Sequence, residues 1–261
     1  MTSDLGGGLY LDPALYDVVN AQGTAREIDA LDRVARRCAA RSGPGAVWLE
    51  PGCGTGRYLR VLARRGRRVR GYDSLPAMLA YARARLVRGG GDWRLAAGSF
   101  TDPAADLVDL GPADVAFCPV NSLRHLADDG AVLAHLAQIA ALLAPDGVYL
   151  VGIDLHHENR VIEEDVWEGA RGGLHVTQVV QYLPPAAGDR RERVIVEVMA
   201  TRPRGVEHRS HRYDLRTYTE REWRALVDGS ALRRRATFDA RGRPREGTAR
   251  LPYQIEVLEP R

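Results

Sequence analysis

Residues 46–56 of the 261-residue chain read AVWLEPGCGTG. The first five of these residues are mostly apolar and predict a short buried strand. The loop that follows carries glycines at positions 52, 54 and 56, and glycine lets the backbone adopt positive φ and approach a ligand closely. Residues 57–65 predict a helix whose free N–H groups and positive dipole end would face that ligand. The stretch therefore predicts the strand, glycine loop and helix of a ligand-binding α/β fold.

The rest of the first half alternates strand and helix patterns. An amphipathic helix is predicted for 24–40, strands for 68–72, 93–97, 113–118 and 147–153, and helices for 75–86 (with Ser74 as its N-cap) and 130–143. Short connections between alternating strands and helices favour a parallel sheet covered on both faces. Two C-terminal strands, 232–238 and 253–258, complete it. We therefore expect an α/β fold with a doubly wound, mostly parallel, seven-stranded Rossmann-like sheet.

The pattern changes after the fifth strand. Three strand-like stretches, 174–183, 194–200 and 206–215, are separated by turn residues and predict an antiparallel insertion. Thr219 and Glu222 form a capping-box pattern for a helix over 219–227. We expect four parts in the chain: an N-terminal lid and helix (1–42), a ligand-binding core (43–169), the antiparallel insertion as an acceptor cap or dimer interface (170–216), and the C-terminal end of the core sheet (217–261).

The composition excludes several kinds of chemistry. All 37 basic residues are arginine, so a lysine Schiff base and a Walker-type phosphate lysine are both excluded. The net charge of only +3 does not indicate a nucleic-acid surface, and no apolar run is long enough to span a membrane. Three scattered cysteines and an N-terminus without a secretion-signal pattern predict a cytoplasmic location.

The spacing of the glycines narrows the ligand. A dinucleotide fingerprint has the pattern G-x-G-x-x-G, whereas residues 52–56 have G-x-G-x-G. Glu50 ends the strand before this loop, where a carboxylate would repel a pyrophosphate but would suit the ammonium group of a methionine moiety. Asp73 follows the second strand, at the place where an acidic residue can accept both ribose hydroxyls. The glycine spacing and Glu50 favour S-adenosylmethionine, with dinucleotide binding as the alternative, and Asp73 is compatible with both ligands.

Several other segments extend this pattern along the chain. They are YDSLPAML at 72–79, LYD at 15–17, RE at 26–27, NSLRHL at 121–126 and the run from His208 to Thr219. Together with the glycine loop, these segments resemble the class I S-adenosylmethionine-dependent methyltransferases, and among them the TDP-aminosugar N,N-dimethyltransferases. The resemblance implies methyl transfer from S-adenosylmethionine, with S-adenosylhomocysteine as product, to an amine of a small-molecule acceptor.

The resemblance also implies roles for individual residues. Cofactor contacts are implied for Tyr10, Glu50, Gly52, Gly54, Gly56, Asp73, Ser74, Met78, Ser99, Phe100, Pro119 and Asn121. Ser99 departs from the family pattern, because the family places an acidic residue there to bind the adenine amino group. A tyrosine in the N-terminal lid closes the cofactor site in this family, and both Tyr10 and Tyr16 are candidates for it.

His125 is the candidate catalytic base, and Tyr16 is the second catalytic candidate. His125 follows the fourth strand, at the edge of a doubly wound sheet where substrates bind. A protonated amine has no lone pair for attack on a sulfonium methyl, and a neutral histidine can remove that proton. The same histidine could serve an O-methyltransferase, and a cofactor-binding protein without transferase activity is a third possibility.

Three other features have simpler interpretations. Cys118, next to Pro119, is expected to be a buried small hydrophobe rather than a nucleophile. His156 and His157, flanked by Asp154 and Glu158, are expected to form a polar rim above the acceptor pocket rather than a metal site. Arg124, Arg209 and Arg212 are the candidate contacts for an acidic or phosphate-bearing acceptor.

Overall fold

A computed structural model describes residues 10, 12–155, 161–186, 188–247 and 251–261. Its main sheet has seven strands in the order β10-β11-β5-β4-β1-β2-β3. These strands are β1 (Val47–Pro51), β2 (Arg68–Asp73), β3 (Trp93–Ala97), β4 (Ala113–Cys118), β5 (Leu143–Ile153), β10 (Leu232–Asp239) and β11 (Gln254–Pro260). The strands from β5 to β3 in this order pair in parallel, whereas β11 is antiparallel to both of its neighbours. The expected mostly parallel, seven-stranded sheet is confirmed.

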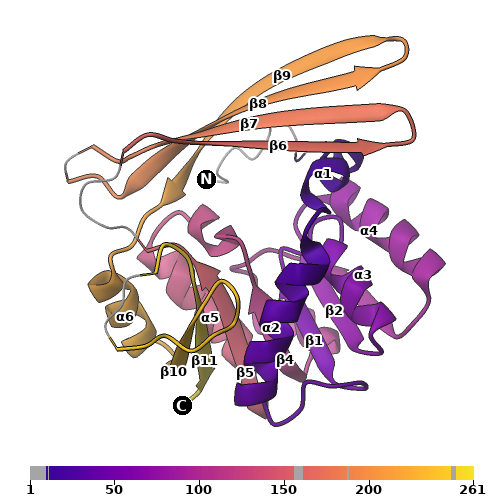
Figure 1. Ribbon diagram of the computed structural model, residues 1–261. Helices are drawn as coiled ribbons and strands as arrows, with labels where there is room; N and C mark the ends of the chain where they lie inside the picture. Colours follow the sequence, from indigo (N-terminus) through magenta and orange to yellow (C-terminus); the bar gives the residue numbers. More distant parts are fainter. Residues whose placement is uncertain (1–9, 11, 156–160, 187, 248–250) are drawn as a thin grey trace.

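Helices cover both faces of this sheet (Figure 1). They are α1 (Pro13–Asn20), α2 (Thr24–Cys38), α3 (Arg57–Arg64), α4 (Pro76–Gly89), α5 (Asp129–Leu142) and α6 (Glu220–Asp228), with short 3-10 helices η2 (Ala104–Leu110) and η3 (Ser122–His125). Thr219 and Glu222 form the expected capping box of α6. Ser74 does not cap α4, because Leu75 occupies the N-cap position without a side-chain hydrogen bond.

Alternating side chains of the central strands fill two separate cores. On β1, Trp48 packs in the core beneath α2 and α3, whereas Leu49 packs in the core beneath α5. On β5, Leu150 and Val151 divide between the cores in the same way. Successive strand residues point to opposite faces of a sheet, so a strand buried on both faces must be apolar throughout. The apolar runs at 47–49 in β1 and 148–151 in β5 are therefore a consequence of the two helical layers.

A separate four-stranded antiparallel sheet, the cap, lies across one end of the core, at the top of Figure 1. Its strands are β6 (Glu163–Arg171), β7 (Leu174–Leu183), β8 (Arg191–Arg202) and β9 (Gly205–Arg216). Three of the four were expected. The cap begins at Glu163, earlier than the expected start at 170. The sequence did not indicate β6 because all of its residues except Gly169 are exposed, so it lacks the alternation that indicates a strand.

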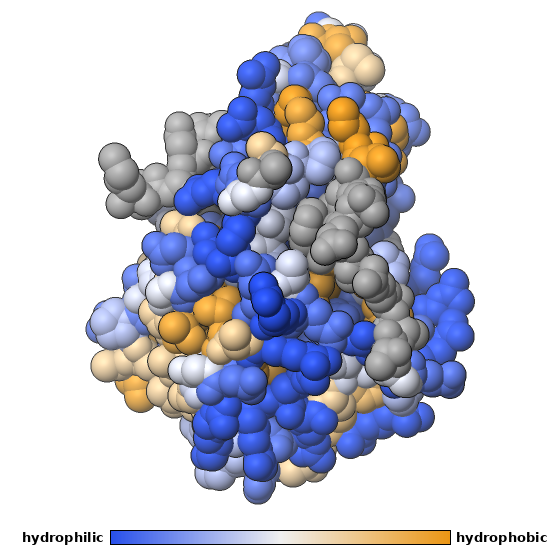
Figure 2. Space-filling model, turned by 90° about the vertical axis from the view of Figure 1, so that its left-hand side faces the viewer, coloured by the Kyte–Doolittle hydropathy of each residue, from blue (hydrophilic) through white to orange (hydrophobic). Residues whose placement is uncertain are grey.

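Helix α1 packs against the inner face of the cap. Leu15, Val18 and Val19 share an apolar core with cap residues such as Val180 and Val196. This helix was not expected from the sequence, although Asp12 accepts hydrogen bonds at its N-terminus and Pro13 begins its first turn. Figure 2 shows a largely hydrophilic face on which several apolar residues gather at the height of the cap. No helix in the described part of the chain is long and apolar enough to cross a membrane.

Candidate active site

The glycine loop lies at the carboxyl end of β1 and adopts a conformation that requires glycine. Gly52, Gly54 and Gly56 have φ values of 61°, 51° and 67°, in the left-handed region that side chains disfavour. A Cβ added to Gly52 would lie 2.8 Å from Cζ of Phe100. The loop therefore passes directly against Phe100, which leaves no space for a side chain at position 52.

Asp73 holds this loop to the second strand. Its Oδ2 accepts a hydrogen bond of 2.8 Å from the backbone N–H of Gly54, and its Oδ1 accepts one of 2.8 Å from the N–H of Leu75. Asp73 is buried, and burial raises the pKa of its carboxyl group. Each carboxylate oxygen has a second lone pair, which can accept a further hydrogen bond. Asp73 can therefore fix the loop and still bind two ribose hydroxyls.

Glu50 is a buried carboxylate at the end of β1 with an unpaired oxygen. Its residue is only 4% exposed, and its Oε2 has no hydrogen-bond partner within the described residues. Burial raises the pKa of Glu50 well above its usual value. An unpaired buried acceptor of this kind is costly unless a ligand satisfies it. Its position beside the glycine loop fits the ammonium group of S-adenosylmethionine.

The other predicted cofactor residues surround the same sheet edge. Ser74 is exposed and Met78 is buried, both following β2. Ser99 follows β3, and its hydroxyl donates a 2.5 Å hydrogen bond to Asp102, which also accepts from the Ser99 backbone N–H at 2.7 Å. Asp102 was missed in the sequence because it lies three positions beyond the expected acidic residue. The structure thus supplies a carboxylate in the segment where Ser99 replaces one.

The turn after β4 is strained. It runs from Pro119 into Val120 and Asn121, which have φ values of 50° and 63°. Positive φ is unfavourable for a β-branched residue, and such strain concentrates at functional sites. The Val120 N–H donates to the hydroxyl of Tyr253 at 3.0 Å, and the Asn121 Oδ1 accepts from the N–H of Asp154 at 2.7 Å. Tyr253, far away in the sequence, was not a candidate, yet it holds this turn.

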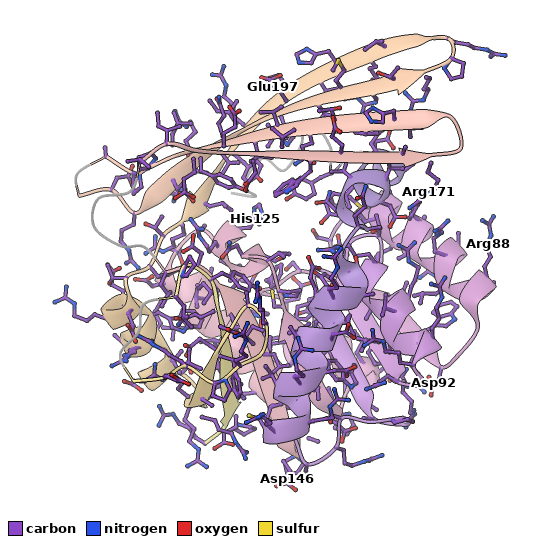
Figure 3. All side chains as sticks on the ribbon, in the orientation of Figure 1. Arg88, Asp92, His125, Asp146, Arg171 and Glu197 are labelled. Atoms are coloured by element: carbon purple, nitrogen blue, oxygen red, sulfur yellow. The ribbon has the colours of Figure 1, made fainter. Side chains whose placement is uncertain are left out.

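A cavity of about 480 Å3 lies between the core and the inner face of the cap. The structure brings the three tyrosine and histidine candidates together there, since Tyr10, Tyr16 and His125 all line it. The cap contributes further walls, among them Trp167, Gln178, Tyr182, His211 and Tyr213. Figure 3 shows His125 in the region between the two sheets. This volume suits a small-molecule ligand.

His125 is surrounded by aromatic rings. Its ring centroid lies 5.2 Å from that of Tyr213 and 6.0 Å from that of Tyr10. Burial, reinforced by the neighbouring Arg124, lowers the pKa of His125 to about 4. The imidazole is therefore neutral at pH 7, with a free lone pair on one ring nitrogen.

Arg124 is not available to a substrate. Its side chain is only 2% exposed, and its guanidinium donates to Glu192 at 2.5 Å and to the Arg216 carbonyl at 2.9 Å. The expectation that Arg124 meets an acidic acceptor is wrong, because the cap supplies its partners. Arg57 is a cavity-lining charge that was missed in the sequence, and it donates to Glu27 at 2.8 Å.

The described residues include neither a reactive cysteine at position 118 nor a cluster of side chains that could bind a metal ion. Cys118 is fully buried, and burial raises the pKa of its thiol to about 12, so it is a poor nucleophile. Among the described residues, no group of three or more histidine, cysteine, aspartate or glutamate side chains could hold a metal ion. His156, His157 and Glu158 lie outside the described residues.

Comparisons with known proteins agree with this geometry. Residues 49–147 match a family model described as a methyltransferase domain. No curated protein matches the sequence. Among solved structures, DesVI from Streptomyces venezuelae is 21% identical with a TM-score of 0.74, covering 95% of this chain and 96% of its own.

Two further solved structures are similar over nearly their whole lengths. CalS10 from Micromonospora echinaspora, an amino pentose methyltransferase solved with S-adenosylmethionine bound, is 24% identical with a TM-score of 0.66, covering 92% of each chain. The sugar N-methyltransferase KedS8 from Streptoalloteichus is 21% identical with a TM-score of 0.68, covering 98% of this chain and 95% of its own. Residues 49–147 are therefore a methyltransferase domain, and the whole chain has the fold of the class I S-adenosylmethionine-dependent methyltransferases.

Proposed function

We propose that this chain transfers the methyl group of S-adenosylmethionine to an amine of a small molecule bound beneath the cap, with His125 as the base that removes the proton of the ammonium. The observation that carries this proposal is the cavity of about 480 Å3 that His125 and Tyr16 line, at the carboxyl end of the sheet where the glycine loop lies. Parallel α/β sheets bind their ligands at that edge. S-adenosylhomocysteine is the expected second product.

The donor end is formed by residues of β1, β2 and the glycine loop. S-adenosylmethionine supplies an electrophilic methyl group on its sulfonium. Glu50 would hold the ammonium group, Asp73 the ribose and the backbone of Gly52 to Gly56 the methionine part. Ser74, Met78, Ser99 and Phe100 would surround the adenosine, and Pro119 and Asn121 would form the wall beside the transferred methyl group. The unpaired Oε2 of Glu50 is the strongest support for this assignment.

The acidities of the two kinds of acceptor favour an amine over a hydroxyl. An alkylammonium has a pKa of about 10 in water, and burial lowers it. A hydroxyl resembles water, with a pKa of about 16. The proton of a buried ammonium is therefore far easier to remove than that of a hydroxyl, whichever base accepts it. O-methylation is therefore the weaker alternative, and N-methylation is also the activity named for KedS8.

The cap offers unpaired polar atoms to an acceptor. Gln178 Oε1 and His211 Nδ1 are buried without hydrogen-bond partners in the described part of the chain, and both residues line the cavity. Between them in the sheet, β8 presents Val196 and Val198. An apolar surface between two hydrogen-bonding side chains suits a ring that has both hydroxyl groups and C–H faces. A sugar-type amine fits this surface better than a wholly apolar one.

The test has two stages. Calorimetry with S-adenosylhomocysteine establishes the donor site. The protein is then incubated with a methyl-labelled donor and a panel of amino sugars, each matched by the sugar with a hydroxyl in place of the amine, and the products are identified by mass spectrometry. We expect label only on amines. Label on the hydroxyl partners would favour O-methylation, and donor binding with no product from any acceptor or metabolite extract would favour a non-catalytic protein.

The proposed base is tested with His125→Ala. We expect a loss of about 10²-fold to 10⁴-fold in methyl transfer at pH 7, the usual contribution of a positioned base, with donor affinity retained. His175→Ala is the matched control, because His175 is an exposed histidine on β7. Unchanged transfer by His125→Ala would show that the amine reaches the site already deprotonated and that His125 is not the base.

A further inference from the structure

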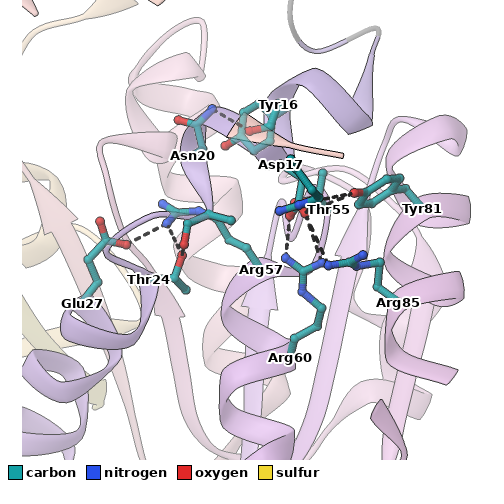
Figure 4. Close-up of polar contacts among 12 residues, drawn as sticks. Tyr16, Asp17, Asn20, Thr24, Glu27, Thr55, Arg57, Arg60, Tyr81 and Arg85 are labelled. Atoms are coloured by element: carbon teal, nitrogen blue, oxygen red, sulfur yellow. Dashed lines mark hydrogen bonds and ion pairs between the residues drawn. The ribbon is translucent and has the colours of Figure 1, made fainter. Parts of the chain in front are cut away.

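Asp17 is a completely buried carboxylate that the proposed chemistry does not use. It lies on α1 next to Tyr16 and has no exposed surface. Figure 4 shows polar side chains from several elements converging on it. An ionised carboxylate in such a place requires partners, and the identity of those partners indicates what it holds together.

One side of Asp17 contacts the core that holds the donor. Its Oδ1 accepts a hydrogen bond from the hydroxyl of Thr55 at 3.2 Å and from the guanidinium of Arg60 at 2.5 Å. Thr55 stands between Gly54 and Gly56 in the glycine loop, and Arg60 lies in the helix that follows the loop. This oxygen therefore connects α1 to the segment that would cradle S-adenosylmethionine.

The other side of Asp17 contacts the cap. Its Oδ2 accepts from Arg171 of the cap at 2.8 Å, and also from two groups of the core, the hydroxyl of Tyr81 on α4 at 3.1 Å and the guanidinium of Arg60 at 3.3 Å. Arg171 is the last residue of β6 and lies near the turn of the β6–β7 hairpin, beside α1 (Figure 3). Arg171 also donates to the Tyr81 hydroxyl at 3.2 Å. This oxygen therefore connects α1 to a cap hairpin whose strands wall the acceptor cavity.

The backbone of β6 lies directly on α1. A Cβ added to Gly169 would come within 2.2 Å of the Val18 carbonyl oxygen, and the Gln22 side chain donates to the Glu168 carbonyl at 2.5 Å. Burial opposes ionisation of Asp17, but the hydrogen bonds from Arg60 and Arg171 outweigh it and lower the pKa of Asp17. The carboxylate is thus charged at neutral pH and depends on both the core and the cap for its compensation.

We propose that Asp17 is a positioning residue that couples the donor loop to the cap, so that donor binding at the glycine loop tightens the β6–β7 hairpin over the acceptor cavity. The connection runs from Thr55 through the two oxygens of Asp17 to Arg171. The proposal rests on the proposed function, because it takes the glycine loop as the donor site. Its consequence is ordered binding, in which the acceptor cavity is completed only after the donor is in place.

The experiment measures hydrogen exchange in the β6–β7 hairpin, residues 163–183, with and without S-adenosylhomocysteine. In the unmodified protein, we expect the ligand to slow exchange there about fivefold to tenfold, a typical coupling between two sites. Arg171→Ala removes only the cap connection, and the Arg171 side chain is 42% exposed, so the variant should fold. It should lose the hairpin protection while ligand protection of the glycine loop persists.

Two further variants separate coupling from a general loss of cap stability. Arg171→Lys keeps a charge that can reach Asp17 and should restore part of the protection. Arg193→Ala removes an exposed arginine that pairs with Asp214 elsewhere on the cap, and it should behave like the unmodified protein. The coupling alone is overturned by either of two results. One is that the ligand protects the hairpin equally in Arg171→Ala and in the unmodified protein. The other is that the ligand binds the unmodified protein without protecting the hairpin. Failure of S-adenosylhomocysteine to bind the unmodified protein overturns the proposed function and the coupling together.

Discussion

The unpaired oxygen of Glu50 makes a quantitative prediction about donor binding. In the free protein, Glu50 is 4% exposed, burial raises the pKa of its carboxyl group, and its Oε2 has no partner among the described residues. The ammonium group of the donor would give that oxygen a charged hydrogen bond, worth about 1.5–3 kcal/mol. Glu50→Gln keeps the shape but removes the charge, so we expect the affinity for S-adenosylhomocysteine to fall about 10-fold to 150-fold.

The same argument predicts a proton signature. Because burial raises the pKa of Glu50 in the free protein and an ammonium partner lowers it again, ligand binding at neutral pH should release protons from the carboxyl group. Calorimetry in buffers with different ionisation enthalpies measures this release. It should disappear in Glu50→Gln, whose free form should be no less stable to heat, since the buried oxygen it replaces is unpaired.

Glu164→Gln is the matched control for this experiment. Glu164 is an exposed glutamate on β6 that accepts a hydrogen bond from Gln181 at 2.8 Å, so its substitution makes the same chemical change away from the glycine loop. It should leave both affinity and proton release unchanged. If Glu50→Gln binds S-adenosylhomocysteine as tightly as the unmodified protein and still releases protons, the assignment of Glu50 to the ammonium group is refuted.

Three other predictions concern the loop, the core and the cap. Gly52→Ala should lower the free energy of unfolding in urea more than Gly54→Ala does. Both substitutions incur a left-handed backbone cost of about 1–2 kcal/mol, but only a side chain at position 52 meets Phe100. Equal losses of unfolding free energy would contradict this packing. Burial lowers the pKa of His135 to about 4, below its unfolded value of about 6.5, so the unfolded state binds more protons in this range. About 3 kcal/mol of stability should therefore be lost as the pH falls from 6.5 to 4. His135→Gln should reduce this loss, and an unchanged loss would show that another group causes it. Gln178→Leu should raise the KM of the methylated acceptor about 2-fold to 10-fold without changing donor affinity, and an unchanged KM would place the acceptor away from β7.

The sequence alone predicted the core fold because the deciding signals are local. The glycine loop, the acidic residues at the ends of β1 and β2, and the apolar strands each occupy a few consecutive residues, and β4 was predicted with its observed limits. Strand β6 and helix α1 were missed. Only Gly169 of the edge strand is buried, so no apolar alternation marks it, and α1 is a short helix whose main apolar partners are residues of the cap.

The candidate site also has a part that the sequence predicted and a part that only the structure established. By itself, the sequence predicted which residues would hold the donor, since Glu50, the loop glycines and Asp73 follow two strands that were expected to be adjacent and parallel and to end at one edge of the sheet. Only the tertiary structure decided the partners that are distant along the chain. It assigned Arg124 to Glu192 of the cap instead of to a substrate, and it brought Arg171 to Asp17 across 154 positions. Such pairings depend on how the cap and the core pack together, because a long arginine side chain binds whichever carboxylate the fold brings within reach.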